Sequence, residues 1–259
     1  MIHELRLFFV ALQFMTRVPV PRWVGYEAAW LNDSARYFPA VGLCVGACAA
    51  ATLVLAHAVL GTAVAVGLSM AASVVLTGGF HEDGLADTCD ALGGTVDRER
   101  ALAIMKDSRI GSYGALGLLL VLGLKAAALA TLPLALAVPA LLMAHTASRA
   151  AAVLVIRALP YAGDAAHAKA KPMAQRVGAA GASLALAWVP ALALLIVWHR
   201  PSDLPALGMG LLLAGVAGIV CARCWQRRLG GYTGDTLGAT QQLTELMLLL
   251  GWLVAARMP

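Results

Sequence analysis

The 259-residue sequence predicts an all-α fold, namely a polytopic helical membrane protein with about six to seven transmembrane helices and an N-terminal interfacial helix. The first observation is composition: 61% of the residues are hydrophobic, 13% are charged and the mean hydropathy is +0.80. Soluble domains are about 45–50% apolar and about 25% charged. The second observation is that the apolar residues form long continuous runs, unlike a disordered chain or the alternating strands of an outer-membrane barrel.

The predicted elements follow one another without a linker or an internal repeat, so we expect one domain over residues 1–259. Residues 2–15 are too few to span a bilayer, and their pattern favours a helix lying along the membrane surface. Pro19 and Pro21 then keep a loop extended. Seven apolar runs predict spans at about residues 38–60, 62–77, 113–131, 132–159, 178–198, 204–224 and 243–256. Pro133 and Pro139 could also divide the stretch from 113 to 159 differently.

The basic residues predict which loops face the cytoplasm, because lysine and arginine concentrate on that side of a membrane. With the N-terminus in the cytoplasm, 15 of the 19 lysine and arginine residues fall in cytoplasmic segments, with Lys169 and Lys171 among them. The outer loops are short and carry almost no charge. We therefore expect the chemistry to face the cytoplasm, and we interpret the net charge of +5 as topology and expect no nucleic-acid partner.

Acidic residues concentrate after the second predicted span, where seven of the chain's 14 lie between residues 82 and 107. If the second helix continues through Asp90, then Asp83, Asp87 and Asp90 stand at positions i, i+4 and i+7 of one narrow stripe. Three such carboxylates repel one another unless a cation lies among them. Oxygen ligands at this density suit Mg²⁺ or Mn²⁺, with substrate phosphates completing the shell. The stripe therefore predicts a divalent-metal site, and a solvated run of unrelated acids is the alternative.

The residues that flank the stripe have less specific patterns. His81 could act as a general base or a phosphate donor, and an ordinary hydrogen-bonded histidine is the alternative. Asp97 and Glu99 alternate with Arg98 and Arg100, which is typical of a solvated helical turn.

A second polar segment, residues 104–114, contains two cations beside a carboxylate and a hydroxyl. Lys106 and Arg109 could hold phosphate oxygens opposite a bound metal, with Asp107 and Ser108 next to them. Anchoring of the chain at the cytoplasmic surface is the alternative.

A third polar segment, residues 230–240, precedes the last predicted span. Its four glycines offer backbone N–H groups, and its side chains offer hydroxyls and a carboxylate, so it could bind a ligand or form an ordinary turn. Glu245, Arg149 and Lys125 lie inside predicted spans, where ionisable groups are functional candidates by default. Arg149 could instead pair with Glu245 or an aspartate, and Lys125 could extend to the membrane surface.

Five blocks of the sequence together resemble one enzyme family. Residues 14–21, 38–42, 78–94, 104–114 and 230–245 are similar to blocks of the cobalamin synthases, the adenosylcobinamide-GDP ribazoletransferases, and run in the same order over nearly the whole chain. The most specific strings are HEDGLADTCD at residues 81–90 and TGDTLG at residues 233–238. Glu82 departs from the family pattern, which has an apolar residue at that position.

The resemblance implies an enzyme of the bacterial cytoplasmic (inner) membrane with its active site facing the cytoplasm. The reaction would join adenosylcobinamide-GDP to α-ribazole or α-ribazole 5′-phosphate, release GMP and use Mg²⁺. In this reaction Asp83, Asp87 and Asp90 would hold the metal, and Asp87, Asp90 and His81 are the catalytic candidates. The substrate-binding candidates are Arg17, Lys106, Asp107, Ser108, Arg109, Arg149, Thr233, Gly234, Asp235, Thr236 and Glu245. The expected partners are these substrates and the lipid bilayer, with a homo-oligomer or other late cobalamin-pathway enzymes as further candidates.

Two other functions stay open from the sequence. The aspartate stripe also resembles that of the CDP-alcohol phosphotransferases, which use metal-bound aspartates for the same bond exchange and make lipids. Phe80 stands where their first aspartate would be. A cation- or proton-coupled transporter is the third alternative, but transporters place such groups near the bilayer midplane and often within inverted repeats.

Overall fold

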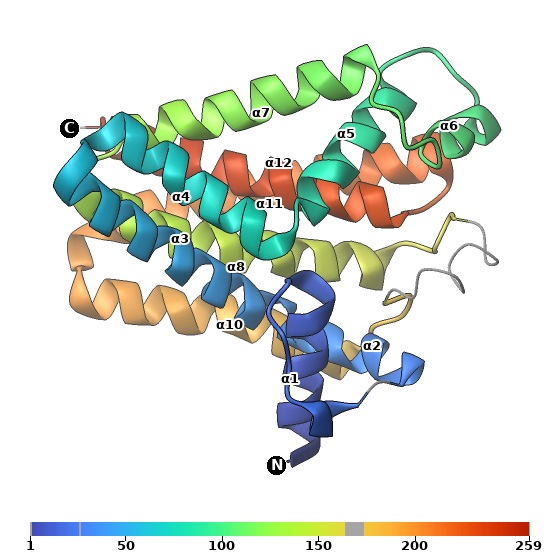
Figure 1. The fold of residues 1–259 in the computed structure, drawn as a ribbon, viewed down its shortest axis with the longest axis horizontal. Coiled ribbons are helices and arrows are strands. Elements are labelled where there is room, and N and C mark those ends of the chain that lie inside the picture. Colours follow the sequence, from blue (N-terminus) through green and yellow to red (C-terminus); the bar gives the residue numbers. More distant parts are fainter. Residues whose placement is uncertain (1, 26, 164–173, 259) are drawn as a thin grey trace.

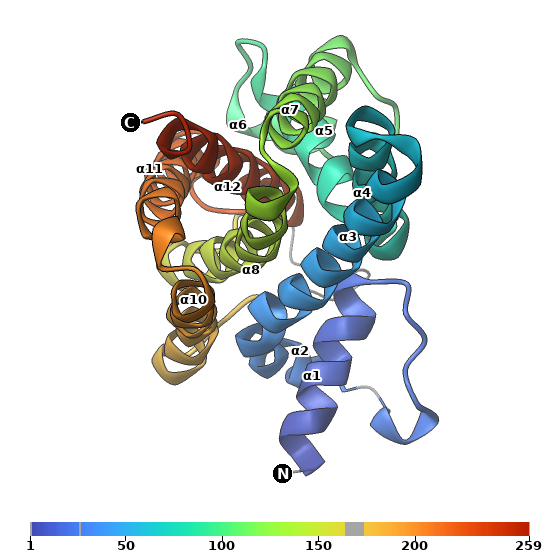
Figure 2. The same cartoon turned by 90° about the vertical axis from the view of Figure 1, so that its left-hand side faces the viewer.

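The structure, a computed structural model, describes residues 2–25, 27–163 and 174–258, which form a bundle of long helices (Figures 1 and 2). In this part of the chain, five helical segments are long and apolar enough to cross a membrane, and a bent pair of helices is a sixth candidate. The predicted all-α membrane fold is therefore confirmed. The five segments contain α3 (Phe38–Leu60), α7 (Ser112–Thr131), α8 (Leu134–Ala158), α10 (Ala179–His199) and α11 (Leu204–Leu229).

The second predicted span has the predicted bounds, and the condition that its helix continues through Asp90 is not met. α4 (Thr62–Thr77) stops at Gly78 and Gly79, which both have φ of 73°, and α5 (Phe80–Leu92) continues at 90° to it. Two successive left-handed residues favour glycine strongly, because a Cβ would clash with the backbone there. The three aspartates nevertheless share one helix, since α5 contains all of them.

The last predicted span is the end of a longer helix, α12 (Gly234–Ala255). The predicted loop at residues 230–240 is therefore wrong beyond Thr233. α12 is not among the helices apolar enough to cross a membrane, because its first half is polar. It is enclosed instead by α5, α8 and α11, and Gln241, Gln242 and Glu245 are buried within the bundle.

The N-terminal region has the predicted helix with the predicted bounds, α1 (Ile2–Met15). α1 runs across the direction of α3 and α8 (Figure 1) and packs against α3 and the short α2 (Ala28–Ser34). This orientation suits a helix lying along a membrane surface. Its position at the membrane interface stays a prediction.

The polar segments of the sequence meet at one end of the bundle, opposite the C terminus in Figure 1. The short α6 (Arg98–Ile104) packs there against α5 and the end of α11. Arg228 donates a hydrogen bond to the Gly94 carbonyl oxygen at 3.2 Å, which ties the end of α11 to the segment after α5. Lys169 and Lys171, which belong to the topology prediction, lie outside the described residues.

Candidate active site

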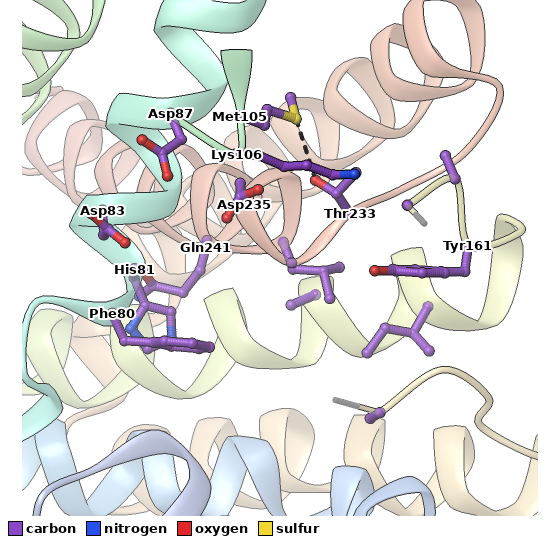
Figure 3. Close-up of a pocket in the computed structure, with 18 of the residues that line it drawn as sticks. Phe80, His81, Asp83, Asp87, Met105, Lys106, Tyr161, Thr233, Asp235 and Gln241 are labelled. Carbon is purple, nitrogen blue, oxygen red and sulfur yellow. Dashed lines mark hydrogen bonds between the residues drawn. The ribbon is translucent and has the colours of Figure 1, made fainter. Parts of the chain in front are cut away.

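A cavity of about 660 Å³ lies at this end of the bundle, a volume within the range of about 300–1,000 Å³ that is usual for small-molecule sites (Figure 3). α5, α8 and α12 supply much of its wall, together with the segments that follow α6 and α8. The three polar segments of the sequence therefore converge on one space. Most of the predicted site residues line it: His81, Asp83, Asp87, Lys106, Asp107, Ser108, Arg149, Thr233, Gly234 and Asp235.

Two of the three α5 aspartates face this cavity. Asp83 and Asp87 stand on successive turns of α5 on one side of it (Figure 3). Asp235 comes from the start of α12, which approaches α5 closely because Gly84 and Gly238 face each other. A Cβ at Gly84 would lie 2.8 Å from the Asp235 carbonyl oxygen. The glycine contact thus brings a third carboxylate into the cavity that holds the first two.

Asp90 has a different position, and the predicted three-aspartate site needs correction here. One of its oxygens accepts a hydrogen bond from the Gly111 N–H at 2.7 Å, and the other accepts one from the Gly114 N–H at 2.8 Å. Asp90 thereby holds the start of α7, where backbone N–H groups lack helical partners. A Cβ at Gly111 or Gly114 would lie 2.4 or 2.3 Å from these oxygens, so a side chain at either position would displace the Asp90 carboxylate.

The described residues contain no group of three or more His, Cys, Asp or Glu side chains arranged to hold a metal by themselves. Asp83 and Asp87 can still contribute to a Mg²⁺ site, because Mg²⁺ is commonly held by one or two carboxylates together with substrate phosphates and water.

The segment after α6 supplies a cation to the cavity, but one cation and not the two that were predicted. Lys106 extends toward the region of Asp235 and Thr233 (Figure 3). The Arg109 side chain is 86% exposed and binds Asp107, with 2.6 Å between Nη2 and Oδ2. Hydrogen bonds from Arg109 lower the pKa of Asp107 from 3.8 to about 2. Arg109 is not among the residues that line the cavity, so its predicted grip on phosphate has no support in this arrangement.

The threonines of the third polar segment start α12. The Thr236 N–H donates to the Thr233 hydroxyl at 3.2 Å, and the Thr233 N–H donates to the Thr236 hydroxyl at 2.8 Å. This capping box satisfies N–H groups that would otherwise lack partners. Thr236 is fully buried and does not line the cavity, so its predicted contact with substrate is replaced by a structural role. Thr233 and Gly234 do reach the cavity wall.

Buried polar side chains form the floor of the cavity. His81, Arg149 and Gln241 are 4%, 1% and 1% exposed, and all three line the cavity. The His81 Nε2, Arg149 Nε and Gln241 Oε1 atoms have no hydrogen-bond partner among the residues that the structure describes. Unpaired buried polar atoms are costly, so these three atoms are suited to a ligand that supplies the missing partners.

Gln241 is a site residue that the sequence interpretation missed. The available signal was the pair Gln241 and Gln242 just before the apolar run of the last span, since amides are unusual in such a helix.

Glu245 lies deeper in the bundle and away from the cavity, contrary to its predicted role in substrate binding. Its Oε1 atom lies 2.5 Å from Lys125 Nζ, and its Oε2 atom lies 3.1 Å from His145 Nδ1. Lys125 is 5% exposed, so it does not extend to the membrane surface. Arg149 donates to the His145 carbonyl oxygen at 3.0 Å. Glu245 thus belongs to a buried ion-pair network beneath the cavity floor.

Arg17 lies on the other side of the α5 carboxylates. It lines a second, more open cavity of about 620 Å³ together with Asp83, Asp87 and Ser108, which also line the first one. The Arg17 N–H donates to the Leu76 carbonyl oxygen at 2.8 Å, and its side chain packs on Gly78, where a Cβ would lie 2.5 Å from Nε. The contacts with Leu76 and Gly78 therefore hold Arg17 against the bend after α4.

The predicted solvated helical turn is confirmed, because residues 97–100 are exposed at the start of α6, but Arg98 also makes contacts that the prediction did not include. Arg98 donates from Nε to the Leu229 carbonyl oxygen at 2.6 Å and from Nη2 to the Ala162 carbonyl oxygen at 3.3 Å, and it lines the cavity. Asp97 caps α6 by accepting from the Arg100 N–H at 2.8 Å. No local signal predicts the contacts of Arg98, because its partners lie far away in the sequence.

Comparison with known proteins agrees with the resemblance. The family described as cobalamin-5-phosphate synthase matches residues 7–253. The chain belongs to this family. A protein of Leptothrix cholodnii named adenosylcobinamide-GDP ribazoletransferase is 60% identical over 256 residues, covering 98% of this chain and 97% of that protein. Proteins of the same name from Albidiferax ferrireducens and Shewanella amazonensis are each 45% identical, covering 95% of this chain and 97% and 94% of their own. No solved structure matches the chain significantly.

Proposed function

We propose that the cavity is the active site in which this chain joins adenosylcobinamide-GDP to α-ribazole, or to α-ribazole 5′-phosphate, and releases GMP. Membership of the cobalamin synthase family and the names of its relatives support the overall reaction. The active site is assigned to this cavity because Asp83, Asp87 and Lys106 all line it. Carboxylates and an ammonium group are what the transfer of a charged phosphoryl group requires.

The α5 carboxylates fit a Mg²⁺ ion shared with the diphosphate of the substrate. Asp83 and Asp87 offer oxygen ligands from one helical turn to the next, and Asp235 adds a third carboxylate to the cavity. Bound Mg²⁺ would neutralise charge on the diphosphate and on the departing GMP.

The side chains of the protein would bind the diphosphate and accept the proton of the attacking hydroxyl. A ribose hydroxyl of ribazole attacks the phosphorus bonded to cobinamide, the bond from that phosphorus to the oxygen of GMP breaks, and GMP leaves with the bonding electron pair. Lys106 binds non-bridging phosphate oxygens and stabilises their negative charge. The hydroxyl proton goes to the Asp87 carboxylate or to His81 Nε2, which both line the cavity. Asp90 is a poor acceptor because both of its oxygens bind the start of α7.

The same proposal includes a bacterial inner-membrane location with the cavity open to the cytoplasm. Most basic residues belong to segments at the cavity end of the bundle, and such segments usually stay in the cytoplasm.

The test is the reaction itself, with purified protein in lipid vesicles, Mg²⁺, adenosylcobinamide-GDP and α-ribazole. We expect equal amounts of GMP and a cobalamin product, loss of both with EDTA and recovery with added Mg²⁺. Absence of any cobalamin product would overturn the function. Full turnover in EDTA would contradict the proposed requirement for Mg²⁺ but not the proposed reaction.

A further inference from the structure

The cavity changes in chemical character along its length. Asp83 and Asp87 stand at one end, Lys106 and Asp235 come next, and Tyr161 lies at the other end in Figure 3. The side chains of α8 and the neighbouring alanines make the wall around Tyr161 mainly apolar, and Arg98 reaches the same end through its hydrogen bond to the Ala162 carbonyl oxygen at 3.3 Å. We define the Tyr161 end by Ala152, Ile156, Tyr161, Ala162 and Ala174, which line the cavity and include no charged side chain.

The helix α8 connects the polar floor with the Tyr161 end. Arg149, Ala152 and Ile156 are at positions i, i+3 and i+7, which lie on one face of a helix. Ile156 is therefore about 10 Å further along the helix axis than Arg149, at about 1.5 Å per residue. Ile156 and Ala174 are buried in one hydrophobic cluster, and Tyr161 packs against this cluster.

Three backbone polar groups at the Tyr161 end have partners within the protein. The Ala162 N–H donates to the Tyr232 carbonyl oxygen at 2.8 Å, and the Ala162 carbonyl oxygen accepts from Arg98 at 3.3 Å. The Ala174 carbonyl oxygen accepts from the Tyr232 hydroxyl at 3.3 Å. A ligand at this end therefore meets mainly apolar surface, and burying an unpaired polar group there would be costly.

The floor, which lies toward the aspartates in Figure 3, is different because it has polar atoms without a hydrogen-bond partner among the described residues. His81 Nε2, Arg149 Nε and Gln241 Oε1 lie buried there. The cavity thus offers apolar surface at the Tyr161 end, and charged groups and the hydrogen-bonding atoms of the floor toward the aspartates. This arrangement matches the parts of a nucleoside that reacts at a phosphate: an aromatic base at one end, and a ribose with its reacting oxygen at the other.

We propose that the Tyr161 end binds the aromatic base of ribazole, with the ribose over the floor and the reacting hydroxyl at Asp83 and Asp87. This inference rests on the proposed function, because it assigns one of the two substrates to part of the same cavity. The other candidate base is the guanine of adenosylcobinamide-GDP. Guanine carries a carbonyl group, an amino group and a ring N–H that need partners, whereas a benzimidazole base has a single ring nitrogen to satisfy. The paired backbone and apolar side chains of the Tyr161 end therefore favour the benzimidazole.

The test is two-substrate kinetics of the Ile156→Phe variant in lipid vesicles, since the larger ring narrows the Tyr161 end. The KM for α-ribazole should rise by about tenfold or more, while the KM for adenosylcobinamide-GDP stays within about twofold. The matched control is Leu194→Phe on α10, where the side chain is 72% exposed on the outer surface, and both KM values should stay unchanged.

A second measurement needs no variant. Benzimidazole should inhibit the unmodified enzyme competitively against α-ribazole and not against adenosylcobinamide-GDP. Competition of benzimidazole with adenosylcobinamide-GDP would overturn the assignment and favour guanine at this end. An Ile156→Phe variant in which only the KM for adenosylcobinamide-GDP rises would do the same. If Ile156→Phe does not fold, the benzimidazole result decides. Absence of product from the unmodified enzyme would instead overturn the proposed function.

Discussion

Helix α5 carries carboxylates of two kinds on one stripe. Asp83 and Asp87 face a cavity that also contains Lys106. Asp90, less than one turn further along, gives both oxygens to the backbone N–H groups of Gly111 and Gly114. The three side chains are chemically identical and lie on the same helix. Their roles differ because Asp90 is hydrogen-bonded to the start of α7.

Glu245 gives a second contrast with the cavity aspartates. It lies inside the bundle with Lys125 and His145, while Asp83 is exposed to the cavity. Position in a membrane helix marked Glu245 as a functional candidate, yet its oxygens are bound within the protein. The difference teaches that the role of a carboxylate depends on whether the fold places it at a cavity or against partners inside the bundle.

The largest expected effect separates the two kinds of aspartate on α5. Asp83→Asn should lower kcat by about 10²–10³-fold, because an amide cannot replace the carboxylate charge at a phosphoryl-transfer site. The thermal unfolding midpoint should stay unchanged. The measurement is turnover in lipid vesicles with saturating Mg²⁺, beside an unfolding scan.

Asp90→Asn is the matched control for this prediction. It should keep activity within about tenfold and lose about 1–3 kcal/mol of stability, because one of its two hydrogen-bond acceptors is replaced by a donor that faces an N–H group. If Asp90→Asn instead removes turnover as completely as Asp83→Asn with no loss of stability, the distinction between the two kinds of carboxylate is wrong.

The next largest effect is on stability and concerns the buried ion pair. Glu245→Gln should lower the free energy of unfolding by about 3–5 kcal/mol, because Lys125 then stays buried without a counter-charge. Denaturant titration in detergent measures this loss. The double variant Lys125→Met with Glu245→Leu should recover part of it, since no unpaired charge is left. A double variant as unstable as Glu245→Gln would contradict this explanation.

The smallest effect is expected for the exposed pair of Arg109 and Asp107. Arg109→Gln should leave both KM values within about threefold, because Arg109 does not line the cavity, and it should cost little stability because exposed ion pairs contribute little. The pKa of Asp107 should rise from about 2 toward 3.8, since hydrogen bonds from Arg109 lower it in the folded protein. A lowered pKa in the folded state stabilises the protein above about pH 4 and ceases to do so as the pH falls toward 2. The variant should therefore lose stability at neutral pH by a small, pH-independent amount and show a weaker pH dependence between pH 4 and 2.

NMR titration of the labelled Asp107 carboxyl group measures this change in pKa. A tenfold rise in the KM for adenosylcobinamide-GDP in Arg109→Gln would show that Arg109 binds the substrate after all.

Much of the fold could be predicted because apolar runs have a minimum length for crossing a membrane. The spans that correspond to α3, α7, α8, α10 and α11 follow from this constraint. The bend at Gly78 and Gly79 could not be predicted from hydropathy, since glycine is tolerated inside membrane helices and becomes a turn only in the context of its neighbours. The early start of α12 was missed for a related reason. A helix enclosed by other helices can be polar along one half and still be stable, because its partners lie in the protein.

The sequence by itself determined that this protein is a helical membrane protein, which family it resembles and which three polar segments carry its chemistry. Composition, spacing and order along the chain are local quantities, and they were enough for these conclusions. Only the tertiary structure decided which members of those segments face a common cavity: Asp83 and Asp87 do, Asp90 holds a helix end, Glu245 is ion-paired in the bundle, and Gln241 joins the cavity floor. The physical reason is that the neighbours of each side chain come from distant parts of the chain, and packing rather than spacing along the sequence brings them together.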